Sequence, residues 1–74
     1  MPPSSSLIYG RHPVLTALEQ QVPVDRILMH QTISGENIGD ILRLARERQI
    51  PVIRVPQEKL HHLVKGNHQG VVAY

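Results

Sequence analysis

Apolar runs with two different spacings alternate along this chain, and this alternation limits the folds that are open to it. Three runs place apolar residues at helical spacing, and a short aliphatic run typical of a buried strand follows each of them. Prolines and glycines stand between the runs and end the elements. Alternating helices and strands predict a three-layer α/β/α sandwich, in which helices cover both faces of a small mixed sheet.

The first two helices have clear boundaries in the sequence. The first is expected to start near Arg11, directly after Gly10, and to end before Pro23. The second has apolar residues at i, i+3, i+4 and i+7 from Ile38 onwards and should end near Gln49, because a proline follows two residues later.

The remaining elements are shorter. Ser34 and Asn37 are candidate N-caps of the second helix, since their side chains can accept a hydrogen bond from free helical N–H groups. A third helix is expected over residues 57–64, with Lys65-Gly66 ending it. The expected strands cover residues 26–30, 52–55 and 71–74.

Seventy-four residues are enough for one domain with a thin core. Residues 1–6 are rich in proline and serine and are expected to form a disordered tail, which leaves residues 7–74 as the domain. There is no cysteine, so neither disulfides nor a thiolate metal site can add stability. Neither a targeting segment nor a membrane-spanning run is recognisable, and a cytoplasmic location is expected.

The net charge is +2 with a sequence pI near 9.5, which gives only a mild preference for anionic partners. Tyr9 and Tyr74 are the only aromatic residues. A platform on which many bases stack is therefore not expected, and any nucleic acid would be recognised through its shape and phosphates.

The polar loop before the last strand is the first candidate site. Asn67, His68 and Gln69 can each donate and accept hydrogen bonds, and Lys65 adds a positive charge. Such a loop suits a polar, anionic ligand.

The start of the first helix is the second candidate site. Gly10, Arg11 and His12 lie where free backbone N–H groups and the helix dipole favour a phosphate, and Arg11 can donate two hydrogen bonds at once. The alternative is structural: Gly10 permits the turn, and Arg11 is a solvated surface charge.

No metal site or catalytic residue is expected. The adjacent His61 and His62 would point about 100° apart on a helix, and no two histidines have the i, i+4 spacing of a shared ion. The arginines of residues 43–54 share their region with acidic residues at i, i+3 and i+4, which favours a solvated face of mixed charge over a basic patch.

Two stretches resemble a known family. Residues 8–14 read Ile-Tyr-Gly-Arg-His-Pro-Val, and residues 68–73 read His-Gln-Gly-Val-Val-Ala. They are similar to the N-terminal substrate-binding domain of SpoU-type RNA ribose 2′-O-methyltransferases, in the SPOUT superfamily. A Tyr-Gly-x-His pattern opens the first helix there, and His-Gln-Gly precedes the last strand. The resemblance covers residues 7–74, although Pro13 stands where many relatives carry alanine.

The resemblance implies a fold like that of ribosomal protein L30e, with the helix start and the last loop side by side on one RNA-contacting edge. The residues expected to bind RNA are Gly10, Arg11, His12, Lys65, Asn67, His68 and Gln69. For His68 and Gln69 the alternative is a structural role, either in the loop or against a further domain.

The resemblance also implies a longer enzyme. A separate knotted domain would bind S-adenosylmethionine and form a homodimer, whereas this domain would need no cofactor, be inactive alone and be a monomer. The expected partner is structured RNA, ribosomal rather than transfer RNA, with a guanosine of 23S rRNA as target. The alternatives are a stand-alone L30e-type structural RNA-binding protein and a protein-interaction module that docks a catalytic partner.

Overall fold

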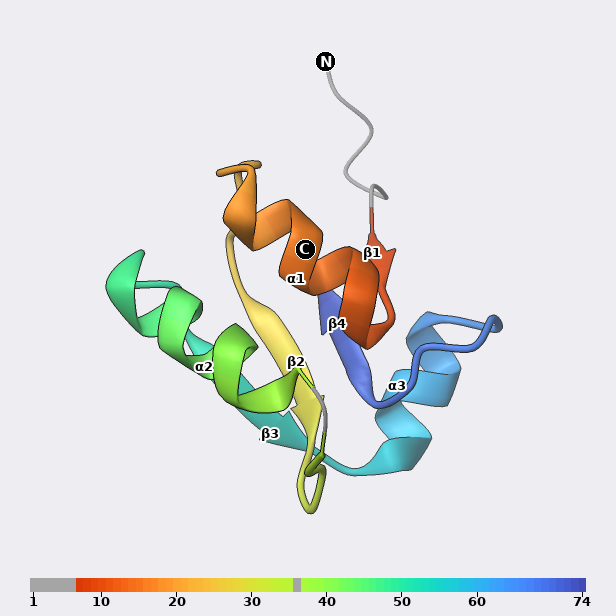
Figure 1. The fold of residues 1–74 in the computed structure, drawn as a ribbon. Helices are drawn as coiled ribbons and strands as arrows, with labels where there is room; N and C mark the ends of the chain where they lie inside the picture. Colours follow the sequence, from red (N-terminus) through yellow and green to blue (C-terminus); the bar gives the residue numbers. More distant parts are fainter. Residues whose placement is uncertain (1–6, 36) are drawn as a thin grey trace.

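The structure is a computed structural model that describes residues 7–35 and 37–74 (Figure 1). The disordered tail expected over residues 1–6 lies outside the described residues. Helices and strands alternate along the chain as predicted, and a short strand precedes them. The elements are β1 (Ile8–Tyr9), α1 (Arg11–Glu19), β2 (Ile27–His30), α2 (Ile38–Glu47), β3 (Val52–Val55), α3 (Gln57–Leu63) and β4 (Val71–Ala73).

The sheet has the strand order β1-β4-β2-β3. β2 and β3 are parallel, as expected for two strands joined by a helical crossover, and β4 runs antiparallel to both β2 and β1. The last strand of the chain therefore lies in the middle of the sheet. This position brings the loop before β4 next to elements from the first half of the chain.

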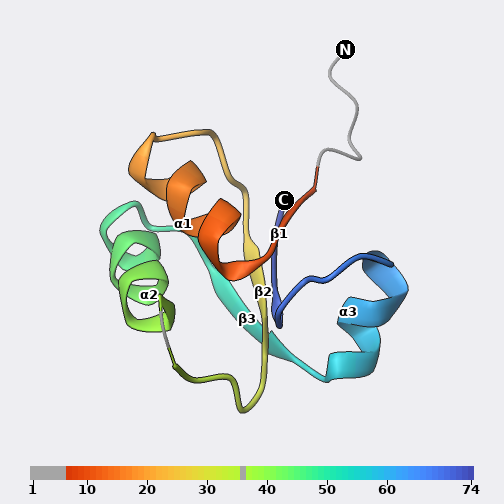
Figure 2. The same ribbon diagram turned by 45° about the vertical axis from the view of Figure 1, so that its right-hand side comes forward.

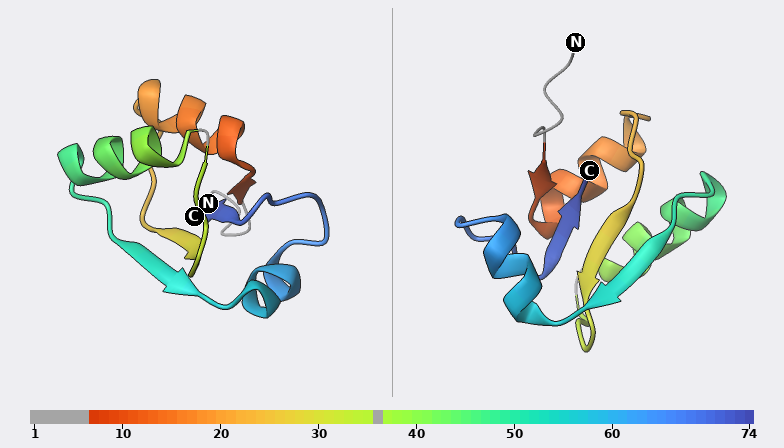
Figure 3. Two further views of the ribbon diagram at one scale, coloured as in Figure 1. Left: turned by 60° about the horizontal axis from the view of Figure 1, so that its bottom comes forward. Right: turned by 180° about the vertical axis from the view of Figure 1, so that it is seen from behind.

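Helices cover the two faces of the sheet, so the predicted three-layer sandwich is confirmed. In Figure 2 the sheet runs between α1 and α2 on one side and α3 on the other. Because alternate residues of a strand face opposite sides, Ile27 and Met29 pack in the cluster with α1 and α2, whereas Leu28 packs in the cluster with α3. Both views in Figure 3 show the same separation of the helices.

β1 was not predicted from the sequence. Only Ile8 and Tyr9 form this strand, which pairs with Ala73 and Val72 of β4. Two residues are too few to show the alternation of buried and exposed side chains that marks a strand in a sequence. The pairing exists because β4 lies alongside, and this neighbour could not be inferred from the local pattern.

One helix end and one predicted cap are set by features that the sequence did not show. α1 ends at Glu19, four residues before Pro23, because Gln21 adopts a left-handed conformation and closes the helix. Asn37 occupies the N-cap position of α2, but its φ of 70° is left-handed and its side chain makes no capping hydrogen bond. Ser34 lies too far before the helix to cap it.

Candidate functional site

The start of α1 and the loop before β4 lie against each other. The backbone N–H of Arg11 donates to Oε1 of Gln69 at 2.9 Å, and Nε of Arg11 donates to the carbonyl of Gln69 at 3.3 Å. The N–H of Gly10 donates to the carbonyl of Val71 at 3.0 Å. The juxtaposition of the two predicted segments is therefore confirmed.

Gln69 caps α1. The first N–H groups of a helix have no partner within the helix, and a side-chain oxygen at the N-cap usually accepts from one of them. The N-cap residue here is Gly10, which has no side chain. Oε1 of Gln69 supplies the missing acceptor from a loop far along the chain.

Arg11 joins a third segment to these two. Its Nη1 donates to the carbonyl of Ser34 at 2.9 Å, in the connection between β2 and α2. The guanidinium is thereby held at the N-terminal end of α1. Charge and helix dipole both favour an anion at this position.

His68 is buried, with 4% of its surface exposed. Its Nδ1 accepts a hydrogen bond from the N–H of Gly70 at 2.9 Å, and its Nε2 lies 3.4 Å from Nδ1 of His61. Burial lowers the pKa of His68 below the usual 6.5, and the neighbouring His61 and His30 lower the pKa further. His68 is therefore held as a neutral hydrogen-bonding group that shapes the loop.

Gly70 permits the turn into β4. Its φ is +83°, and a Cβ added to it would lie 2.7 Å from Cδ1 of Ile33. Any other residue would be strained in this conformation and would also clash. Each residue of the His68-Gln69-Gly70 motif thus helps to fix the shape of the loop.

A cavity of about 960 Å³ opens where these segments meet. Arg11 and His12 line it from α1, and Gln57 and His61 line it from α3. The segment after β2 and the loop before β4 supply the other lining residues, which are His30, Thr32, Ile33, Ser34, Asn37 and residues 66–70.

The described lining of this cavity is polar and contains no carboxylate. Arg11 supplies a positive charge, and amide and hydroxyl side chains supply groups that both donate and accept hydrogen bonds. Four of the five histidines of the chain line the cavity; they are His12, His30, His61 and His68. The cavity suits an anionic ligand that also has polar edges.

The structure brings five of the seven predicted site residues into the cavity lining. They are Arg11, His12, Asn67, His68 and Gln69. Gly10 is buried and Lys65 is exposed, and neither of them lines the cavity.

Comparison with known proteins identifies the family of this chain. Residues 7–74 match the family described as RNA 2′-O ribose methyltransferase substrate binding. The chain belongs to this family. The resemblance seen in the sequence is confirmed, and the match includes every segment that lines the cavity.

Relatives of this substrate-binding family occur in longer proteins. The chain is 38% identical over 68 residues to a Staphylococcus aureus protein named for the TrmH family of tRNA/rRNA methyltransferases, which covers 92% of the chain and 27% of that protein. A Staphylococcus saprophyticus protein of the same name is 40% identical over 68 residues, which again cover 92% of the chain and 27% of that protein. The Staphylococcus haemolyticus protein is 37% identical over 90% of the chain and 27% of its own length. The chain thus spans about a quarter of the curated relatives it matches.

No solved structure matches the chain. The likeness to ribosomal protein L30e therefore stays a prediction.

Several lining residues of this substrate-binding domain were not among the predicted RNA-binding residues. They are His30, Thr32, Ile33, Ser34, Asn37, Gln57, His61, Gly66 and Gly70. A topological signal could have found some of them, because ligands of open α/β sheets bind beyond the carboxyl ends of parallel strands. His30 ends β2, and Gln57 follows shortly after β3.

Within residues 7–35 and 37–74, no three histidine, aspartate or glutamate side chains are arranged to hold an ion. The pair His61 and His68 is also unsuited to one. Nδ1 of His68 accepts from a backbone N–H, so the neutral ring carries its proton on Nε2, the atom that faces His61. A protonated ring nitrogen has no lone pair for a metal.

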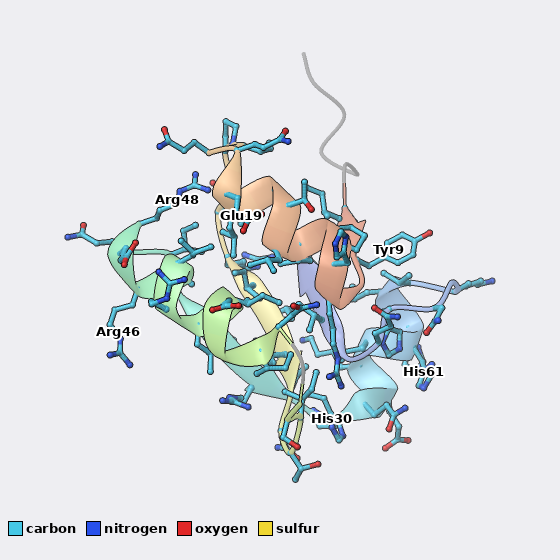
Figure 4. The ribbon with its side chains drawn as sticks, in the orientation of Figure 1. Tyr9, Glu19, His30, Arg46, Arg48 and His61 are labelled. Carbon is cyan, nitrogen blue, oxygen red and sulfur yellow. The ribbon has the colours of Figure 1, made fainter. Side chains whose placement is uncertain are left out.

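Arg43 forms the predicted face of mixed charge on α2, whereas Arg48 donates to the carbonyl of Val22 at 2.9 Å and Arg54 of β3 donates to the carbonyl of His30 at 3.4 Å. Arg43 pairs with Asp40 at 3.4 Å and with Glu47 at 3.6 Å. In Figure 4, Arg46 and Arg48 lie on the opposite side of the molecule from His61. These charges are therefore separate from the cavity.

None of the helices among the described residues is long and apolar enough to cross a membrane.

Proposed function

We propose that this chain holds the RNA substrate of an RNA ribose 2′-O-methyltransferase, and that the RNA binds in the cavity between the start of α1 and the loop before β4. The observation that carries the proposal is the composition of this cavity. Arg11, the N-terminal end of α1 and neutral donors meet there, and its described lining contains no carboxylate. Phosphates of RNA are attracted by such a surface, and carboxylates would repel them.

The cavity also suits the polar edges of RNA. Thr32, Asn37, Gln57 and Asn67 carry hydroxyl or amide groups that can both donate and accept. Ribose 2′-hydroxyls and unpaired bases offer matching groups, whereas a simple phosphate ion needs donors only. The ligand we propose is therefore structured RNA with an unpaired nucleotide, which the domain would deliver to the catalytic region.

For the whole protein we propose S-adenosylmethionine-dependent 2′-O-methylation of a guanosine in 23S rRNA. The family description supports ribose methylation. The relatives are named for both tRNA and rRNA, and we propose rRNA as the substrate. A homodimer formed through the catalytic region and a cytoplasmic location belong to the same proposal.

We propose that S-adenosylmethionine binds outside this domain, because the family that the chain matches is described by substrate binding. This domain alone would then be inactive.

The test is the affinity of the chain for a fluorescently labelled fragment of 23S rRNA, with a tRNA of similar length as competitor. His12→Ala and Asn67→Ala should each weaken binding about 3- to 10-fold, the size expected for one lost hydrogen bond. Both side chains are exposed and line the cavity, so the fold should be unaffected.

Arg46→Ala is the matched control. This arginine is exposed on α2, outside the cavity lining, and its removal should change the affinity less than either cavity variant does. A larger loss of affinity in Arg46→Ala would indicate that RNA binds at α2 instead. Binding no tighter than about 10⁻⁴ M for any RNA would instead favour a protein-interaction module.

A further inference from the structure

A chain of hydrogen bonds fixes where the proton of His68 lies. The N–H of Gly70 donates to Nδ1 of His68 at 2.9 Å. Nδ1 must therefore carry a lone pair, and the neutral ring has its proton on Nε2. The backbone of the loop thus selects one tautomer of this buried histidine.

This tautomer in turn fixes the proton of His61. Nε2 of His68 lies 3.4 Å from Nδ1 of His61, and the two rings meet edge to face with centroids 4.7 Å apart. Since Nε2 of His68 is the donor, Nδ1 of His61 must be the acceptor. Neutral His61 then has its own proton on Nε2. The other tautomer would place two N–H groups against each other.

Nε2 of His61 is available to a ligand. His61 lines the cavity, and this atom makes no hydrogen bond among the described residues. Figure 4 shows His61 on α3, at the end of the sheet where His30 closes β2. The cavity wall therefore presents an N–H whose donor role is set by the loop.

We infer that His61 is a hydrogen-bond donor subsite of the cavity, selective for an acceptor atom of the bound RNA. Acceptors in RNA are phosphate oxygens, base carbonyls and purine N7. An exocyclic amino group is a donor, so it would place two N–H groups against each other and would be rejected. This inference rests on the proposed function for the identity of the ligand. The tautomers on which it depends are properties of the free chain.

The first test needs no RNA. Long-range ¹H–¹⁵N spectra of the labelled chain at neutral pH distinguish the two neutral tautomers of histidine. We expect both His61 and His68 to carry their proton on Nε2. A proton on Nδ1 of His61 would overturn the inference.

The second test measures affinity for the 23S rRNA fragment. His61→Ala should weaken binding about 3- to 10-fold, and His61→Gln, which places an amide N–H at similar reach, should retain more of the affinity. His62→Ala is the control, because His62 is the next residue of α3, is exposed and does not line the cavity. Equal binding by the wild type and His61→Ala would overturn the subsite and leave the proposed function standing, whereas failure of the wild type to bind RNA would overturn both.

Modified RNA distinguishes the two sources of an acceptor. If His61 meets a base, replacing the acceptor atom at one unpaired position, by 7-deazaguanosine for N7 or by a thiocarbonyl base for a carbonyl oxygen, should weaken binding of the wild type and have little further effect on His61→Ala. If His61 meets a phosphate, a single methylphosphonate linkage should behave in the same way. Such non-additivity marks a direct contact. The absence of coupling between His61 and every modified position would contradict the inference.

Discussion

Oε1 of Gln69 accepts a hydrogen bond from the backbone N–H of Arg11 at 2.9 Å, so a residue of the last loop caps the first helix. The segments proposed to bind RNA are therefore also bound to each other. A change in the loop will alter α1, and measurements on loop variants need a stability measurement beside the affinity.

The cap itself can be tested by Gln69→Ala. The variant should lose about 1 kcal/mol of stability, the usual effect of removing an N-cap acceptor. Denaturant unfolding followed by circular dichroism measures the loss. Gln31→Ala is the control, since Gln31 is exposed and its side chain makes no hydrogen bond among the described residues. An equal loss in the two variants would show that Gln69 does not cap α1.

A Gly70→Ala substitution should destabilise the fold by about 1 to 3 kcal/mol, because the new Cβ would be strained by its positive φ and would meet Ile33. Gly39→Ala offers a matched contrast within α2. A Cβ at Gly39 meets nothing within 4 Å, and alanine is the better helix former by up to about 1 kcal/mol. The midpoint temperature of thermal unfolding should be higher for Gly39→Ala than for the wild type and lower for Gly70→Ala. The reverse order would contradict the loop geometry.

The stability of the fold should fall as the pH is lowered. The pKa of His68 is lowered in the folded chain, so below about pH 6.5 the unfolded chain binds a proton that the folded chain does not. The contribution of His68 is present above this pH and is lost as the pH falls toward the folded pKa. Urea unfolding between about pH 7.5 and pH 5.5 measures the slope.

The variant His68→Gln identifies the source of this pH dependence. Glutamine does not titrate, so the slope should be smaller than in the wild type, while His12→Gln should leave most of it unchanged because His12 is exposed. An unchanged slope in His68→Gln would assign the pH dependence to other groups.

The strands with a clear apolar run were predictable from the sequence, and β3 was predicted with its observed bounds, Val52–Val55. β1 was not, because its two residues depend on pairing with β4 for their conformation. The predicted capping of α2 was wrong because of the local backbone conformation. Asn37 has the right chemistry, but its backbone is left-handed and its side chain makes no capping hydrogen bond.

The site was predictable where chemistry and motif coincide, at Arg11 and in residues 67–69. His61 was considered only as a metal ligand, because its neighbour His68 lies seven residues away in the sequence and meets it only after the loop folds back. Residues after β2 carry no local sign of a site. They reach the cavity through the parallel pairing of β2 with β3.

The most direct test of the central claim is an NMR titration of the ¹⁵N-labelled chain with a structured fragment of 23S rRNA. The amide signals of Arg11, His12 and residues 67–69 should shift most, and the shifts should weaken as salt is raised, because phosphate contacts release counterions. Shifts centred on Arg43 and Arg46 of α2, or no localised shifts at all, would contradict the claim that the cavity holds RNA.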